Sequence, residues 1–332
     1  MRIENLAELA QRVAPEGEPG LLPAIEKELV HYHVLQAMSE ERLLGEMTFQ
    51  GGTCLRLCYG SPRYSEDLDF AAGSNFYDLD LMGFSERLAR RLGDVFGGAV
   101  RVKEPRAHQG PSQVAVARWT VIIRTAPRRD DLPSQRIKVE VASVEALTRE
   151  LRRVENNYDA LPASLSGWLI SCESKKEILA DKIVSFANTK SHYRRRDLWD
   201  IPYLLATTPL DDEVAALVAH KLRDYECQFE ACELADRAAE RIATVLSDGT
   251  LSRELSRFLP RALFDNQLGN GGEHLAAETL RAYSKVVEEL VGHESEFENE
   301  GVEVRPVIGD LRNGPQAGPQ LSHDQEHADP YR

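Results

Sequence analysis

The spacing of apolar residues changes near residue 170. Before that point, apolar and polar residues alternate in short runs, which is the period of a strand with one buried face. Beyond it, apolar residues recur every three or four positions, as in helices, over residues 172–188, 196–205, 211–225, 230–246, 251–258 and 274–291. The pattern therefore predicts an α+β fold, with a small mixed sheet in the first half and an all-helical second half.

The first half is expected to contain strands at residues 47–50, 67–71, 114–125 and 136–142, and helices at 21–45 and 78–96. In the last of these strands, Ile137 and Val141 would face one way and Glu140 the other. The run Gly51-Gly-Thr ends the first strand, and a short helix is expected from Cys54 to Tyr59.

These patterns divide the chain of 332 residues into four segments. We expect a helical segment at 1–45, a mixed-sheet core at 46–170, a helical domain at 171–293 and an acidic, disordered tail at 294–332. The chain has 54 acidic and 40 basic residues, a net charge of −14, and the tail carries six of those negative charges. This balance excludes a protein that coats nucleic acid by bulk positive charge, but it allows a local basic site.

Other features narrow the class of protein. No apolar run approaches the roughly 20 residues of a membrane span, and the N-terminus has acids where a signal peptide would be apolar. The five cysteines form no C-x2-C pair, so neither a zinc site nor a disulfide framework is expected. Cys54 and Cys58, four apart on the short helix, are interpreted as packing residues. We expect a cytoplasmic protein.

The order strand, glycine turn, short helix and second strand is typical of a site that binds phosphates. Adjacent glycines after a strand let the backbone approach a phosphate, and the helix that follows offers free N–H groups to it. Asp67 and Asp69 share one face of the next strand, where two carboxylates can hold Mg²⁺, and Glu140 could complete a two-metal arrangement from a separate strand. Each piece alone is commonplace, as a turn or a solvated strand face, but together they favour phosphoryl transfer.

Two signatures give a resemblance at family level. The stretch Phe49-Gln-Gly-Gly-Thr-x-Leu-Arg, followed by Arg63-Tyr-Ser-Glu-Asp-Leu-Asp-Phe, resembles the AbiEii/MenT-type nucleotidyltransferase toxins of the polymerase-β-like superfamily. The helix at Ile25-Glu-Lys is similar as well. The downstream runs Glu177-Ile-Leu-Ala-Asp-Lys and Arg195-Arg-Asp-Leu-Trp-Asp are similar to the family's lysine-bearing helix and its Arg-Asp-Leu-Tyr-Asp segment. The resemblance covers residues 25–205.

The sequence departs from the family pattern at three places. Gln50 stands where a lysine is common, and Trp199 stands where the family has tyrosine. The arginine usually found before Arg-Asp has two candidates here, Lys190 and Arg194. These changes leave the carboxylates untouched and bear on the preference for nucleotide or acceptor.

The resemblance implies Mg²⁺-dependent transfer of a nucleoside monophosphate from an NTP to the 3′ end of tRNA. Such transfer blocks translation, and a cognate antitoxin neutralises the toxin. The residues implied to be catalytic are Asp67, Asp69, Glu140, Lys182 and Asp197, of which the first three hold the metal. Those implied to bind the nucleotide are Gly51, Gly52, Thr53, Arg63, Ser65 and Lys182.

A basic run near residue 190 is the candidate RNA contact, and its residues are Lys190, Arg194, Arg195 and Arg196. Arg124, Arg128 and Arg129 form a second candidate patch. Asp197 and Asp200 are three apart on one helix face, where they could orient Lys182 or contact the base. The alternative is that they cap the helix or pair with Arg194, Arg195 and Arg196.

Two alternatives remain open. An enzyme of the same superfamily could act on a small molecule or a protein. A catalytically idle scaffold could keep the fold and bind a partner, although the presence of all three carboxylates disfavours it.

Overall fold

The structure, a computed structural model, describes residues 3–73, 76, 83–97, 100–105, 114–126, 133–189 and 193–299, without the side chains of 293–299. Residues 1–291 form one compact unit, and residues 292–332 are a separate one. In the described part of the chain, no helix is both long and apolar enough to cross a membrane.

The described residues of the first half form a seven-stranded mixed sheet with the order β3-β4-β5-β2-β1-β7-β6. Strands β2 and β5 are parallel, as are β1 and β7, and the other neighbours are antiparallel. The strands are β1 (Thr48–Gln50), β2 (Leu68–Ala71), β3 (Val100–Lys103), β4 (Val116–Arg124), β5 (Ser134–Ala142), β6 (Glu150–Arg153) and β7 (Leu169–Cys172).

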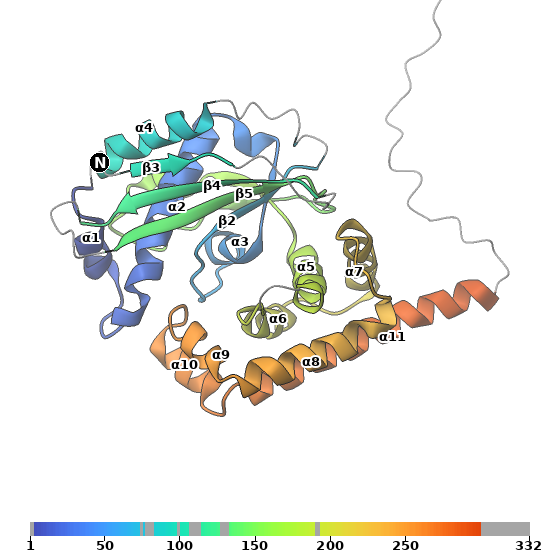
Figure 1. Ribbon diagram of the computed structural model, residues 1–332. Coiled ribbons are helices and arrows are strands. Elements are labelled where there is room, and N and C mark those ends of the chain that lie inside the picture. Colours follow the sequence, from blue (N-terminus) through green and yellow to red (C-terminus); the bar gives the residue numbers. More distant parts are fainter. Residues whose placement is uncertain are drawn as a thin grey trace, which may run out of the picture. The chain divides into compact units, whose positions relative to one another are not determined.

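Helices cover the two faces of the sheet unequally. On one face, α2 packs against β5 and α4 packs against β3 and β4, while α5 to α10 lie on the other side (Figure 1). The helices are α1 (Leu6–Val13), α2 (Leu22–Glu40), α3 (Gly51–Cys58), α4 (Phe84–Phe96), α5 (Lys175–Asn188), α6 (Asp197–Leu205), α7 (Asp212–Asp224), α8 (Leu234–Ser247), α9 (Thr250–Leu255), α10 (Arg261–Leu268) and α11 (Glu273–Asn299).

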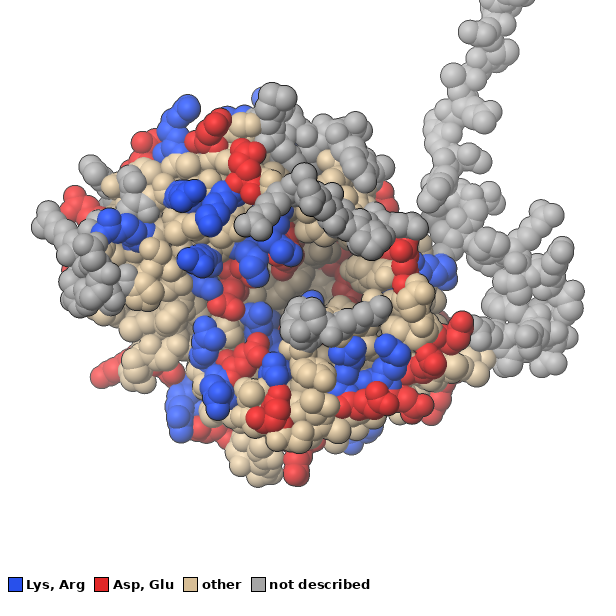
Figure 2. Space-filling view, in the orientation of Figure 1, with Lys and Arg blue, Asp and Glu red and all other residues tan. Residues whose placement is uncertain are grey.

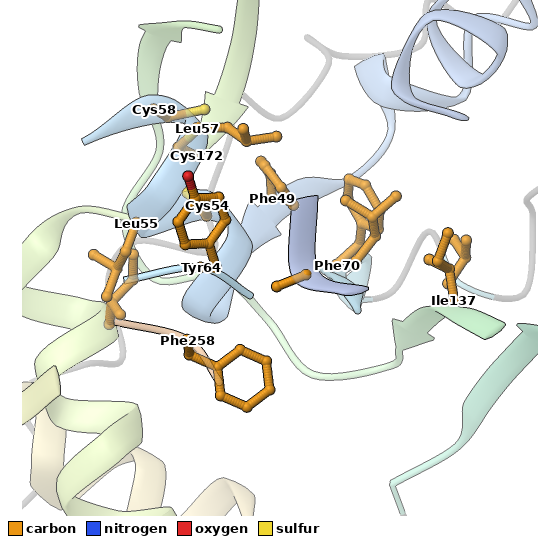
Figure 3. Packing of buried hydrophobic residues seen from close by; sticks show 14 of the residues in the cluster. Phe49, Cys54, Leu55, Leu57, Cys58, Tyr64, Phe70, Ile137, Cys172 and Phe258 are labelled. Carbon is orange, nitrogen blue, oxygen red and sulfur yellow. The ribbon is translucent and has the colours of Figure 1, made fainter. Parts of the chain in front are cut away.

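The main hydrophobic core extends from α2 and the sheet into the helices of the second half, where Ile183 of α5 and Val218 of α7 belong to the same buried cluster. Ile137 and Val141 of β5 are buried, as the alternating pattern predicts. Phe49 of β1 stacks on Phe70 of β2 with ring centroids 5.1 Å apart, and both belong to the cluster of buried residues in Figure 3. Because these side chains fill one face, the residues that alternate with them point to the other face, where the site lies.

The predicted α+β class, with a helical second half, is confirmed. The helix expected from Cys54 begins instead at Gly51, because this glycine has a φ of +76° and turns the chain directly from strand into helix. The helix expected from 172 begins at Lys175, since residues 169–172 form β7 and the Ser174 side chain caps the helix. The division of the chain into four segments stays a prediction.

Candidate active site

Four polar side chains form one row across the sheet. The register pairs Gln50 of β1 with Asp69 of β2, and Asp69 with Glu140 of β5. It also pairs Glu140 with Arg118 of β4. Side chains of paired residues in neighbouring strands point to the same face, and Asp67 shares that face because it lies two residues before Asp69. Four separate segments of the chain therefore place polar groups at one level.

This row forms the floor of a cavity of about 680 Å³. The opposite wall comes from the helical half, mainly α5, α6 and the segment between them, through Lys182, Ser185, Asn188, Arg194, Asp197 and Asp200. Figure 2 shows a hollow on this face of the molecule, with basic side chains on both sides of it. The cavity is thus built between the polar face of the sheet and the first helices of the second half.

The three carboxylates of the row differ in their partners. Asp67 accepts hydrogen bonds from the backbone N–H of Lys138 at 3.0 Å and from its ammonium at 3.3 Å. Glu140 pairs with the Arg118 guanidinium, with 2.6 Å between Nε and Oε1. No described residue donates a hydrogen bond to the Asp69 carboxylate. Burial, with the charges of Glu140 and Asp67, raises the pKa of Asp69 to about 7.

These carboxylates suit a divalent cation in their chemistry. Asp69 carries a negative charge that burial and two neighbouring carboxylates disfavour, and a bound cation would remove that cost. In this structure the three carboxylates do not converge on one metal position, because Asp67 forms an ion pair with Lys138 and Glu140 forms one with Arg118. Accordingly, the three are not among the described groups whose ligand atoms all lie within 4.8 Å of one another. Two carboxylates would have to exchange a basic partner for the metal.

The two glycines leave room for close packing beside the row. A Cβ on Gly51 would lie 3.0 Å from Oδ2 of Asp69. A Cβ on Gly52 would lie 2.7 Å from Nη2 of Arg63 and 2.9 Å from Oγ of Ser65. These polar groups therefore surround the start of α3, where helix N–H groups have no partner within the helix. A residue with a Cβ at either position would therefore have to displace these polar groups.

A buried network of ion pairs forms the wall opposite the sheet. The Lys182 ammonium lies 2.8 Å from Oδ1 of Asp197 and 2.6 Å from Oδ2 of Asp200. Asp200 also accepts two hydrogen bonds from Arg63, and Asp197 accepts one from Arg194. Burial alone would raise the pKa of each aspartate, but the neighbouring cations outweigh it and lower both. The pairing with an arginine of the basic run therefore holds for Asp197 and Arg194, whereas the arginine partner of Asp200 is Arg63.

A second acidic group lies beside the cavity and was not predicted. The carboxylates of Glu173, Glu177 and Asp181 have ligand atoms within 4.8 Å of one another. The fully buried Lys221 ammonium lies 2.6 Å from Glu177 and 3.2 Å from Asp181. Because this lysine already supplies the cation, we interpret the group as a structural ion cluster, in which burial raises the pKa of Glu173 and of Asp181.

Most of the predicted site residues line the cavity, namely Gly51, Gly52, Arg63, Ser65, Asp67, Asp69, Glu140, Lys182, Arg194, Arg196 and Asp197. Thr53 and Arg195 are not among the lining residues. The Thr53 hydroxyl donates to the carbonyl oxygen of Asp67, and Arg195 pairs with Asp248. Lys190, Arg128 and Arg129 lie outside the described residues, and Arg124 is exposed at the end of β4.

Sequence reasoning gave no role to Lys138, Arg118 or Glu66, and it named Gln50 only as a departure from the family pattern. Lys138 could have been found, because it alternates onto the same strand face as Glu140. Gln50 and Arg118 join the row only through the pairing of strands, which no local pattern specifies. Glu66, outside the cavity lining, pairs with both Lys27 of α2 and Arg196, and so links α2 to the basic segment before α6.

Comparisons with known proteins address the family. None of the curated proteins compared with this chain matches it. A solved structure from H. pylori, described as that of a nucleotidyltransferase candidate, has 17% identity and a TM-score of 0.47, and the match covers 81% of this chain and 97% of that one. The structure of JHP933 from Helicobacter pylori has 18% identity and a TM-score of 0.44, and the match covers 84% and 98%.

The family model that matches this chain is described as the nucleotidyl transferase AbiEii toxin of a type IV toxin–antitoxin system, and it matches residues 33–286. That range includes the glycine turn, the carboxylate row and the Lys182 network. Because the match spans most of the chain, the protein belongs to the AbiEii family of nucleotidyl transferase toxins.

Proposed function

We propose that this toxin transfers a nucleoside monophosphate from an NTP to the 3′-hydroxyl at the end of a tRNA, with Mg²⁺ as cofactor. The observation that carries the proposal is the cavity floor, where the Asp69 carboxylate forms no ion pair with a described residue and lies in register with Glu140. A blocked tRNA 3′ end can no longer receive an amino acid, so translation would stop, and a cognate antitoxin would have to neutralise the protein.

The reaction joins the 3′-oxygen of the acceptor to the α-phosphorus of the NTP, and the bond to pyrophosphate breaks. Asp67, Asp69 and Glu140 would hold Mg²⁺, which when bound supplies charge neutralisation and orientation of the triphosphate. Glu140, the carboxylate on the separate strand, would take the proton of the 3′-hydroxyl or act as a ligand of a second ion.

The basic side chains would bind phosphate oxygens. Arg63 and Lys182 are fixed by Asp200, so their positions are set before the nucleotide arrives. Gly51 and Gly52 are the first residues of α3 and lie next to Ser65. Their backbone N–H groups would bind the triphosphate. Preorganised charge of this kind is the main contribution that a protein makes to phosphoryl transfer.

The acceptor would reach the site as a single RNA end. Arg194 is exposed at the cavity wall, and Arg196 lines it as well. A chain with a net charge of −14 disfavours broad contact with an RNA duplex, so binding should be local and sensitive to salt. The support for tRNA as the acceptor is the resemblance of the two signatures to the AbiEii/MenT-type toxins.

The test uses purified protein, total RNA and each of the four labelled NTPs. Wild type should label tRNA, EDTA should abolish labelling, and Asp67→Asn should lower it at least 100-fold. The matched control is Asp159→Asn, an exposed aspartate outside the cavity, which should label as wild type does.

Equal labelling by Asp67→Asn and wild type would refute the assignment of the carboxylates. Label that appears in a protein extract or a small molecule instead of RNA would refute the acceptor. If the wild type neither binds an NTP nor arrests growth when expressed, the protein is an idle scaffold.

A further inference from the structure

Three cysteines meet at a point away from the cavity. Cys54 and Cys58 lie on α3, and Cys172 ends β7, more than a hundred residues later in the chain. Their sulfur atoms all lie within 4.8 Å of one another, and Figure 3 shows the three side chains together. Cys54 and Cys172 are fully buried and Cys58 is 4% exposed. None of the three lines the cavity of the candidate active site.

The geometry of this cluster suits a metal better than a disulfide within the helix. Residues four apart on a helix have Cβ atoms about 5–6 Å apart, whereas a disulfide needs about 3.8 Å. Cys54 and Cys58 therefore present two separate thiols on one helix face, and Cys172 supplies a third from the neighbouring strand. Three sulfurs at about 2.3 Å from an ion in a trigonal plane lie about 4 Å apart, which is within the observed limit.

We propose that Cys54, Cys58 and Cys172 form a three-coordinate site for a soft monovalent ion, copper(I). Thiolates select soft ions, and a structural zinc site needs four ligands. Among the His, Cys, Asp and Glu side chains that the structure describes, no fourth ligand joins this group. Cys54 and Cys172 have no exposed surface, so bulk water does not contact them in the folded protein.

The Cys172 side chain is held in place before an ion binds, because its thiol donates to the carbonyl oxygen of Ile170 at 3.8 Å. Coordination by a cysteine needs the thiolate, so each of the three thiols would release its proton to solvent as it binds the ion.

The position of the cluster would link the ion to the frame of the active site. Cys172 pairs with Phe49 of β1, and Cys54 directly follows Thr53, whose hydroxyl holds the backbone of Asp67. An ion that joins α3 to β7 would therefore clamp the turn that carries Gly51 and Gly52. Since it binds only the folded protein, it should also raise the thermal unfolding temperature.

The experiment is a titration of the reduced full-length protein with copper(I) under anaerobic conditions, against a competing chelator. Wild type should retain one ion per chain, with an ultraviolet thiolate-to-metal charge-transfer band and a higher unfolding temperature. Cys172→Ser should bind more than 100-fold more weakly, since even changes outside the ligand shell cost 10–100-fold. The matched control is a double substitution of Cys227 and Cys232 by serine; Cys232 is exposed, and neither belongs to the cluster.

A second measurement does not depend on how the variants fold. X-ray absorption of the copper(I)-loaded wild type should show three sulfur ligands and no nitrogen or oxygen ligand. The proposal is overturned if wild type retains no ion, if the double variant loses the ion, if two sulfurs are found, or if zinc binds as tightly as copper(I). None of these outcomes depends on the proposed nucleotidyl transfer, which is assayed separately with labelled NTP.

Discussion

Replacing Asp69 with asparagine should abolish nucleotidyl transfer and, at the same time, stabilise the metal-free protein. The substitution keeps the shape of the side chain and removes its charge. In the native protein that charge is disfavoured by burial and by the carboxylates of Glu140 and Asp67, which together raise the pKa of Asp69 from 3.8 to about 7. Above this pH the folded protein must hold the Asp69 carboxylate, which forms no ion pair with a described residue, beside the carboxylates of Glu140 and Asp67.

The size of the effect follows from linkage. The folded and unfolded pKa values of Asp69 differ by about three pH units, and each pH unit is worth 1.36 kcal/mol, which gives an upper limit of about 4 kcal/mol. The side chain is only partly buried by its accessible area and is open to the cavity, so we expect about half of this limit, roughly 2 kcal/mol. Because the folded state binds the proton more tightly, the penalty grows between pH 3.8 and about 7 and is complete above that range.

The assay is urea denaturation of wild type and Asp69→Asn in EDTA at pH 8 and again at pH 4. At pH 8 the variant should be about 2 kcal/mol more stable, and the difference should shrink towards zero at pH 4, where the native carboxyl is protonated. Adding Mg²⁺ at pH 8 should stabilise wild type and not the variant. A variant that is less stable than wild type at pH 8 without metal would refute the electrostatic reasoning, whatever its activity.

Three further outcomes concern the walls of the cavity. Lys182→Met leaves the buried carboxylates of Asp197 and Asp200 without their shared cation, so the free energy of unfolding should fall by about 3–5 kcal/mol in urea denaturation, and a loss below about 1 kcal/mol would contradict this. The pKa of each of these aspartates is lowered, so their stabilisation is complete above pH 3.8 and is lost as the pH falls through the folded values. Acid unfolding of wild type should therefore be steeper than that of a variant with asparagine at both positions. Gly51→Ala should cost about 1–2 kcal/mol, since φ is +76°, and should lower transfer activity because the new Cβ meets Asp69; unchanged activity would show that the close approach is dispensable.

Elements with a regular buried face could be predicted from the spacing of apolar residues alone. The strand with Ile137 and Val139 inward was predictable because its alternation is strict and one face is buried. Strand β6, Glu150–Arg153, was not predictable, because it lies at the sheet edge, where Leu151 is 71% exposed and no buried face marks the period.

The same division applies to the site. Spacing alone put Asp197 and Asp200 on one helix face, and both contact Lys182. The pairing of Arg63 with Asp200 spans 137 positions, and the row that contains Arg118 depends on strand register. Contacts of this kind are set by tertiary packing, so a single sequence carries no local signal for them.

The charges of the cavity suggest how a chain with a net charge of −14 could admit an RNA end. Eight acidic and six basic side chains line it. Two of the acids, Glu173 and Asp181, share the Lys221 ammonium, and the other six acids and six bases balance one another formally, so the cavity offers a triphosphate no net positive charge. On the proposed function, Mg²⁺ would take the carboxylates of Asp67 and Glu140, which now engage Lys138 and Arg118. The two basic side chains would then be released beside the metal, and the sign of the cavity floor would reverse. Metal binding would thus create the phosphate site from groups that neutralise one another in its absence.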